Sequence, residues 1–402
     1  MGARMRKQAA YVRDRWTILV ALVVGLGLII GAAGPIAAEQ ASSWESLGLE
    51  GRGVSRLVTP ASGALFAHVT SGLVRSDDGG NSWTDVAGPE GASVVAVAPS
   101  NHDLMYAVGD DGIFRSDNAG ADWRPVSNTP GSMRQLAVSP ADPVTLYGYV
   151  QRGRTLSYGQ EVSHQLAVSR DGGASWEATF ESSERIVPGS QPCFFTLGLI
   201  RPHALDPARV LVSAGCTGRG NDPTPRESMD EGRTMRSFTG EGSQWGVAGV
   251  AGGRGRDPRR WYVSQFLSGR DYGSQYYSRL LTSADDGRTW TRLLQSDGGE
   301  RYGADAVGRP MEDVTRLAGG HDDPDELYAV VTRYEPEGAR PFRYKATGTS
   351  LRATRDGGIS WTDLPELPGG SNVAISDLAV GIDGRYLFAV TSTGVHRLAL
   401  AR

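Results

Sequence analysis

Short apolar runs separated by polar turns are the dominant pattern of the chain from residue 42 onward. Residues 93–126 show it in full: the runs SVVAVAPS, LMYAVG, IFRS and WRPV alternate with the turns NHD and DDG and with one polar box. Runs of this length, bounded by Gly, Asp, Asn and Pro, are typical of β-strands. One such unit therefore predicts a sheet of four short strands.

The same unit recurs along the chain. In each copy an apolar first run is followed by a short turn, often Asp-Pro, and by a second run rich in β-branched and aromatic residues. The predicted first strands begin near Val54, Ser93, Met133, Thr196, Gly246, Asp313 and Ile375. Four-stranded sheets repeated in this way describe the blades of a β-propeller. We predict an all-β, seven-bladed propeller over residues 39–402.

The seventh unit stops at GVHRLALAR, where its box and fourth strand should follow. The segment SSWESLGL (residues 42–49) matches a box ending plus a fourth strand, as in NSWTDVAG. We therefore expect this N-terminal strand to complete the C-terminal blade. Such pairing closes the ring and removes open sheet edges.

An eight-residue box, Ser/Thr-x-Asp-x-Gly-x-Ser/Thr-Trp, lies between the third and fourth strands of six units. One copy, SMDEGRTM, lacks the tryptophan, and SDNAGADW departs at Asn118 and Asp122. Six copies around a ring do not make one active site, so we expect a structural device rather than a metal loop. Its Asp accepts backbone N–H groups, its Gly supplies a positive φ, and its Trp packs between sheets. These structural positions are Asp78, Trp83, Trp123, Asp171, Trp176, Asp230, Asp285, Trp290, Asp356 and Trp361.

On these boxes the sequence resembles the Asp-box, or BNR-repeat, propellers of the sialidase-like superfamily. The resemblance covers nearly all of residues 42–402 and is specific for fold but weakly specific for function. Members of this superfamily include exo-sialidases, xyloglucan-active glycoside hydrolases, sortilin-type receptors and photosystem II assembly factors. Sialidases are six-bladed and carry an N-terminal Phe/Tyr-Arg-Ile-Pro motif, which this sequence lacks. No family catalytic residue can therefore be placed on the chain.

Residues 1–38 differ from the remainder. Basic residues precede an apolar, charge-free run over 16–33, followed by a small-residue segment, Ile36-Ala37-Ala38. A basic stub before an apolar segment is an export signal, either cleaved or retained as a membrane anchor. In both cases residues from about 39 onward are expected outside the cytoplasm, secreted or tethered by a single N-terminal helix.

Cys193 and Cys216 are the two cysteines of the chain. If the strands CFFTLGLI and RVLVSAGC pair with Ile200 opposite Arg209, the two cysteines face each other. A disulfide between them would suit an exported protein, and two unrelated thiols are the alternative.

Insertions of unequal length identify the candidate binding face. They fall between the second and third strands and between blades, mainly in blades three to six. The turns between first and second strands, and the boxes between third and fourth strands, stay short. Long loops on one side of a rigid scaffold are where binding residues gather. The Arg and Tyr residues expected to bind a ligand there are Arg270, Tyr272, Tyr276, Arg301, Tyr302, Arg343 and Tyr344.

The formal charge of −4 gives no reason to expect a nucleic-acid partner. The histidines show no metal spacing, and no metal or cofactor is expected. We predict a non-catalytic binding or scaffold protein that holds a protein partner or a carbohydrate on the long-loop face. The alternatives are a glycoside hydrolase of exo-sialidase-like type and an assembly factor for a membrane protein complex.

Overall fold

The computed structural model describes residues 43–60, 63–92, 94–156, 159–186, 194–217, 221–238, 246–252, 257, 259–268, 276–295, 311–336 and 344–401. The predicted signal or anchor segment lies outside these residues. In the described part of the chain, no helix has the length and apolar character needed to cross a membrane.

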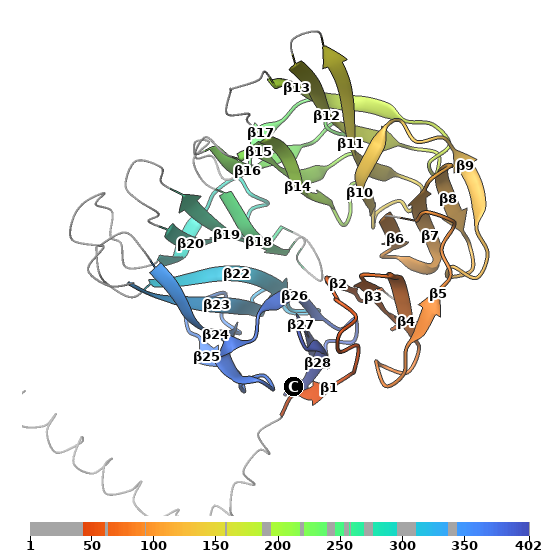
Figure 1. Cartoon of the computed structure of the whole chain (residues 1–402). Coiled ribbons are helices and arrows are strands. Elements are labelled where there is room, and N and C mark those ends of the chain that lie inside the picture. The colour runs from red at the N-terminus through yellow and green to blue at the C-terminus, as the bar shows by residue number, and fades with distance from the viewer. Residues whose placement is uncertain are drawn as a thin grey trace, which may run out of the picture. The chain divides into compact units, whose positions relative to one another are not determined.

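Seven four-stranded antiparallel sheets form the blades of the propeller, as predicted (Figure 1). The innermost strands are β2 (Arg56–Val58), β6 (Val94–Ala98), β10 (Ser132–Val138), β14 (Phe194–Pro202), β18 (Gly246–Gly252), β22 (Met311–Gly319) and β26 (Ile375–Val380). The second strands are β3 (Leu65–Val69), β7 (Asn101–Gly109), β11 (Leu146–Leu156), β15 (Val210–Thr217), β19 (Trp261–Ser268), β23 (Leu327–Pro336) and β27 (Tyr386–Thr391).

The third and outer strands complete each sheet. The third strands are β4 (Gly72–Ser76), β8 (Gly112–Ser116), β12 (Gly159–Ser169), β16 (Asn221–Ser228), β20 (Tyr276–Ser283), β24 (Tyr344–Thr354) and β28 (Gly394–Ala399). The outer strands are β5 (Thr84–Val86), β9 (Arg124–Ser127), β13 (Glu177–Ile186), β17 (Arg236–Ser237), β21 (Thr291–Gln295), β25 (Thr362–Asp363) and β1 (Glu45–Ser46). A short 3-10 helix, η2 (Gly370–Asn372), precedes the seventh blade.

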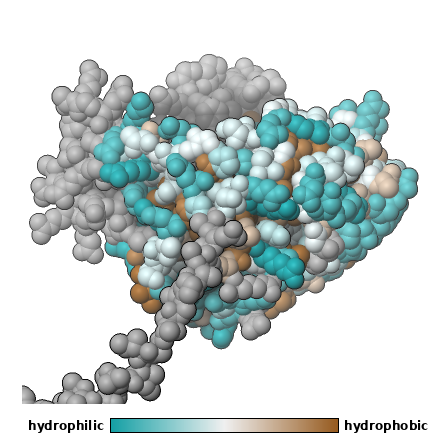
Figure 2. All heavy atoms as spheres, turned by 90° about the horizontal axis from the view of Figure 1, so that it is seen from below, coloured by the Kyte–Doolittle hydropathy of each residue, from teal (hydrophilic) through white to brown (hydrophobic). Residues whose placement is uncertain are grey.

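The seventh blade combines the two ends of the propeller chain. Strand β1 pairs with β28, with Glu45 opposite Arg397 and Ser46 opposite His396. The core lies between neighbouring blades: the cluster joining blades seven and one contains Phe388, Val390 and Leu57. The rim seen in Figure 2 is mostly polar with scattered apolar spots, as expected when each sheet buries its faces against its neighbours.

Each Asp-box is a closed turn of hydrogen bonds. In the first box, Asp78 Oδ1 accepts the Ser82 N–H at 2.9 Å and Asp78 Oδ2 accepts the Ser82 hydroxyl at 2.6 Å. The Ser76 hydroxyl donates to Asp78 and accepts the Gly80 N–H at 2.7 Å. Asp171, Asp230, Asp285 and Asp356 make the same bonds. The carboxylate oxygens are thus used in hydrogen bonds that hold the turn.

The second box replaces the Asp–Ser pair by Asn118 and Asp122, and the two departures compensate each other. Asn118 Oδ1 still accepts the N–H of residue 122 at 2.9 Å, while its Nδ2 donates to Asp122 Oδ2 at 2.9 Å. The side-chain bond is kept with donor and acceptor exchanged, so a copy that reads as irregular in sequence is regular in structure.

This exchange predicts a double-mutant result in the first box. Asp78→Asn alone replaces the charged acceptor of the Ser82 hydroxyl by an Nδ2 donor, which leaves a weaker neutral hydrogen bond, and Ser82→Asp alone places a second carboxylate beside Asp78. Each single change is expected to lower the free energy of unfolding by about 1 kcal/mol. The double variant should restore the wild-type value within about 0.5 kcal/mol. Chemical denaturation of the four proteins measures this, and additive losses would contradict the exchange.

The box carboxylates also predict how stability depends on pH. Hydrogen bonds from Ser82, Thr289 and Ser360 hold the pKa values of Asp78, Asp285 and Asp356 at about 2. Because these pKa values lie below the unfolded value of about 3.9, the stabilisation is complete above pH ~4 and is lost as pH falls toward 2. The melting temperature should therefore fall steeply in this window, and less steeply in Asp78→Asn. A flat profile would be inconsistent with these bonds.

Box tryptophans link neighbouring blades. The indole N–H of Trp83 donates to the Leu47 carbonyl of the preceding blade at 2.8 Å, and Trp123 donates in the same way to Ala87. Trp290 donates to Phe238, whereas Trp176 and Trp361 donate to glycine carbonyls of their own boxes. Trp44, at the N-terminal segment matched to a box ending, donates to Pro365 of the sixth blade at 2.8 Å. In the box without tryptophan, Met235 packs against the core between blades three and four.

The predicted register around the cysteines is wrong. Ile200 pairs with Val212 rather than with Arg209, and Cys216 pairs with Phe195. The strands start pairing only at Pro202 and Val210 because the His203–Arg209 turn is closed by its own backbone bonds, and a bulge after Leu197 shifts the ladder again. Cys193 lies outside the described residues, so the disulfide stays a prediction.

Several segments expected to be loops continue the strands. Residues 151–164 extend the β11–β12 hairpin, with pairing maintained to Leu156 opposite Gly159, and β13 follows β12 out to Ile186. In the sixth blade, β23 and β24 pair out to Pro336 opposite Tyr344. Pairing satisfies backbone N–H and C=O groups that a loop would leave to water. Blades three and six therefore project beyond the five-residue strands of the first blade.

Candidate binding site at the central channel

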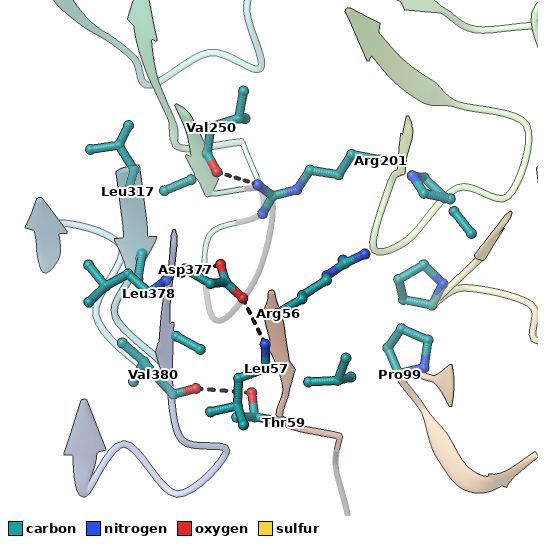
Figure 3. Close-up of a pocket in the computed structure, with 18 of the residues that line it drawn as sticks. Arg56, Leu57, Thr59, Pro99, Arg201, Val250, Leu317, Asp377, Leu378 and Val380 are labelled. Carbon is teal, nitrogen blue, oxygen red and sulfur yellow. Dashed lines mark hydrogen bonds between the residues drawn. The ribbon is translucent and has the colours of Figure 1, made fainter. Parts of the chain in front are cut away.

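A cavity of about 660 Å³ lies along the axis of the ring and is lined by the inner strands of all seven blades (Figure 3). Each inner strand is the free edge of its sheet, so its unpaired backbone groups face the axis. The seven-fold arrangement therefore produces a channel rich in backbone donors and acceptors, which side chains must partly satisfy.

Side chains from neighbouring blades bind these backbone groups (Figure 3). Asp377 Oδ2 accepts the N–H of Leu57 at 2.9 Å, and the Thr59 hydroxyl donates to the Val380 carbonyl at 3.2 Å. On another part of the wall, the Arg201 guanidinium donates to the carbonyls of Val250 at 2.6 Å and Gly252 at 2.8 Å. These contacts join blade seven to blade one and blade four to blade five.

Bulges in five of the inner strands shape this wall. The ladder skips one residue in each of β10, β14, β18, β22 and β26, at Arg134, Gly198, Ala248, Thr315 and Ser376. A bulge leaves the extra residue unpaired and re-aims the side chains beside it. Arg134 and Asp377, at or directly after a bulge, both line the channel.

Two exposed arginines stand where the inner strands begin, which is the face of the long connections between blades. Arg56 projects into the cavity (Figure 3), and its guanidinium makes no hydrogen bond or ion pair with the residues that the structure describes. Within the described ranges, the Arg134 guanidinium makes one weak contact, a 3.4 Å hydrogen bond to Gln151 Oε1. Both guanidinium groups have donors available for a ligand.

Burial opposes the charged forms of the two titratable side chains beside Arg56. Burial, and then the Arg56 charge, lowers the pKa of His68 to about 4, so His68 is neutral near pH 7. Burial raises the pKa of Asp377 above its ordinary value, although the Leu57 N–H and the Arg56 charge act in the opposite direction. This end of the channel therefore carries an arginine beside a carboxyl group whose ionisation is opposed by burial.

Carboxylates at the other end of the channel are held by local bonds. Asp323 accepts the Asp325 N–H at 2.9 Å, and Glu326 accepts the Tyr328 hydroxyl at 2.7 Å. Asp257 accepts the Arg259 N–H at 3.1 Å. Across the described residues, no group of three or more His, Cys, Asp or Glu side chains is arranged to hold a metal ion.

Most of the ligand-binding residues predicted from sequence lie outside the residues that the structure describes. Arg270, Tyr272, Arg301, Tyr302 and Arg343 lie in undescribed segments, and the Tyr276 and Tyr344 backbones begin β20 and β24 at the far ends of two hairpins. Their role in binding stays a prediction.

Sequence reasoning missed the inner-strand residues Arg56, Arg134 and Asp377. The available signal is a charged residue one or two positions before an apolar run, as in SRLV, MRQLAV and ISDLAV.

Comparison with known proteins agrees with the repeated boxes and the propeller. The Sortilin-Vps10 family model (Sortilin, neurotensin receptor 3) matches residues 71–192. The match covers less than a third of the chain, and the structure itself shows a propeller whose turns carry the Asp-box hydrogen bonds. No curated protein sequence matches it.

Three solved structures are similar in fold. The GH74 xyloglucanase from Xanthomonas campestris is 18% identical, with a TM-score of 0.57 over 89% of this chain and 53% of that chain. YCF48 bound to D1 peptide is 12% identical, with a TM-score of 0.53 over 89% and 97%. An oligogalacturonate lyase from Vibrio parahaemolyticus is 7% identical, with a TM-score of 0.55 over 90% and 98%. The chain thus spans about half the length of the xyloglucanase, and at these identities the likeness concerns the fold alone.

Proposed function

We propose that the protein is a non-catalytic binding protein outside the cytoplasm that holds a segment of a partner protein at the end of the channel where the inner strands begin. The single observation that carries this proposal is Arg56, an exposed guanidinium in the cavity with no partner among the described residues. Guanidinium groups bind carboxylates strongly and with defined geometry. The partner segment is therefore one that presents an acidic side chain or a chain end.

Other features support a protein ligand. Arg134 stands at the same end of the channel, and the extended hairpins of blades three and six start from the same face. One similar structure is described as bound to a peptide, which makes a peptide segment a chemically reasonable occupant of such a ring. With residues 1–38 retained as an anchor, the propeller would act at a membrane surface, and the partner could be a subunit of a membrane protein complex.

Site-specific photo-cross-linking tests the proposal. A photoreactive amino acid at Val94, in the channel, is compared with one at Ile359, an exposed residue on a box turn. We expect a discrete partner cross-linked from Val94 and not from Ile359. Equal cross-linking from both positions, or none from Val94, would argue against the channel as the binding site.

A glycoside hydrolase is the second candidate, and Asp377 is the observation that favours it. A carboxyl group with a raised pKa is what a general acid requires, and hydrolysis needs a second carboxylate across the substrate. Incubation with xyloglucan and with sialosides, with released sugar measured, tests this candidate. Release that disappears in Asp377→Asn would replace the binding proposal by a catalytic one.

A further inference from the structure

The outer strand of the third blade is unlike the other outer strands. Strand β13 has 10 residues, whereas β1, β5, β9, β17, β21 and β25 have between 2 and 5. It stays paired with β12 as far as Ile186 opposite Gln160. At about 3.4 Å per residue, the β11–β12 hairpin extends about 20 Å further than the five-residue strands of the first blade.

The far edge of β13 has no strand beside it in the described parts of the chain, because the sheet order is β10-β11-β12-β13. In an antiparallel ladder every second residue directs its N–H and C=O away from the neighbouring strand. Residues Glu181–Ile186 therefore present a row of backbone donors and acceptors at the outer rim of the blade (Figure 1).

Long exposed edges are aggregation hazards, and propellers ordinarily keep outer strands short. We propose that Glu181–Ile186 is a strand-addition site, at which an extended segment of a partner protein pairs with β13 as a fifth strand. This surface is separate from the channel site and does not depend on the proposed function. Backbone pairing would supply the affinity, and side chains along the added strand would supply the specificity.

The charged residues of β13 indicate which kind of partner segment would pair with it. The proposed pairing segment, ESSERI, holds two glutamates and one arginine, and the Glu181 side chain is exposed. Oppositely charged cross-strand neighbours stabilise pairing and like charges oppose it. The occupant is thus an extended segment that carries lysine or arginine opposite Glu181 or Glu184. A second copy of this chain would set a segment of net negative charge against itself.

The test uses the full chain and an octapeptide of alternating lysine and valine with blocked ends. Fluorescence anisotropy should give saturable binding, and hydrogen exchange should show new protection at every second amide of 181–186. The same peptide N-methylated at alternate residues, or with glutamate in place of lysine, should bind about tenfold more weakly or worse. Equal binding of all three peptides, absence of saturable binding, or a dimer formed through β13 would overturn the proposal. Amides of 181–186 already protected as strongly as those of β12 in the free protein would also overturn it.

Proline substitution provides the matched variants. Ser182 and Ser183 are adjacent, so one N–H bonds β12 and the other faces outward. Of Ser182→Pro and Ser183→Pro, one should melt at a lower temperature because it loses a ladder bond. The other should keep the wild-type melt and lose peptide binding, while alanine at the same position keeps both. A proline variant that melts and binds like wild type at each position would contradict strand addition.

Discussion

Replacing Arg209 by methionine is expected to lower the free energy of unfolding by about 3–5 kcal/mol. Arg209 and Glu227 are each only 3% exposed, and Arg209 pairs with both Glu227 and Asp286. Asp286 belongs to the box turn of the fifth blade and also accepts the Trp261 indole N–H at 3.0 Å. Without the Arg209 guanidinium, the buried Glu227 carboxylate loses one of its two positively charged partners. Chemical denaturation measures the loss.

The double variant Arg209→Met/Glu227→Leu is the matched control. Removing both buried charges and filling the space with apolar side chains is often neutral or stabilising. Arg236 then loses a partner but is 57% exposed and can be solvated. We expect the double variant to recover most of the loss of the single one. A single variant as stable as wild type would show that the network does not hold blades four and five together.

Replacing Trp83 by alanine is expected to lower the free energy of unfolding by about 3 kcal/mol, the lower end for tryptophan because this side chain is only partly buried. The ring packs on the cluster between blades seven and one, and its N–H bonds Leu47. Gly80 approaches the same residue: with φ of 98°, it has space for no side chain, since a Cβ would lie 2.5 Å from Leu47 Cδ1. The box thus anchors the segment that follows β1.

Trp83→Phe separates packing from the hydrogen bond. It keeps most of the ring contacts and removes the donor to Leu47, so a loss of about 1 kcal/mol is expected. Trp361→Ala is a further comparison, because that indole bonds a carbonyl of its own box. If Trp83→Ala left the melting temperature unchanged, the box tryptophan would not join the blades.

Most of the fold could be predicted because its signals are local. Each box repeats the same short-range bonds from Asp to the residue four positions later, and each strand is bounded by turn residues. Backbone irregularities were harder to predict. The register of β14 with β15 depends on one bulge and on the His203–Arg209 turn, neither of which an apolar pattern reveals.

The channel site was harder to predict because its residues are far apart in the sequence. Asp377 and Leu57 are 320 positions apart and meet only because the ring brings blade seven beside blade one. The β11–β12 extension was expected as a loop because residues 151–164 form an insertion between the second and third strands of the repeat.

Binding of a partner through Arg56 in the channel can be measured with Arg56→Ala in the full chain carrying the photoreactive residue at Val94. Arg124→Ala, which removes an exposed guanidinium from a box-side ion pair, is the matched control. We expect Arg56→Ala to abolish the cross-linked partner, Arg124→Ala to retain it, and both variants to melt like wild type. Undiminished cross-linking in Arg56→Ala would contradict the assignment.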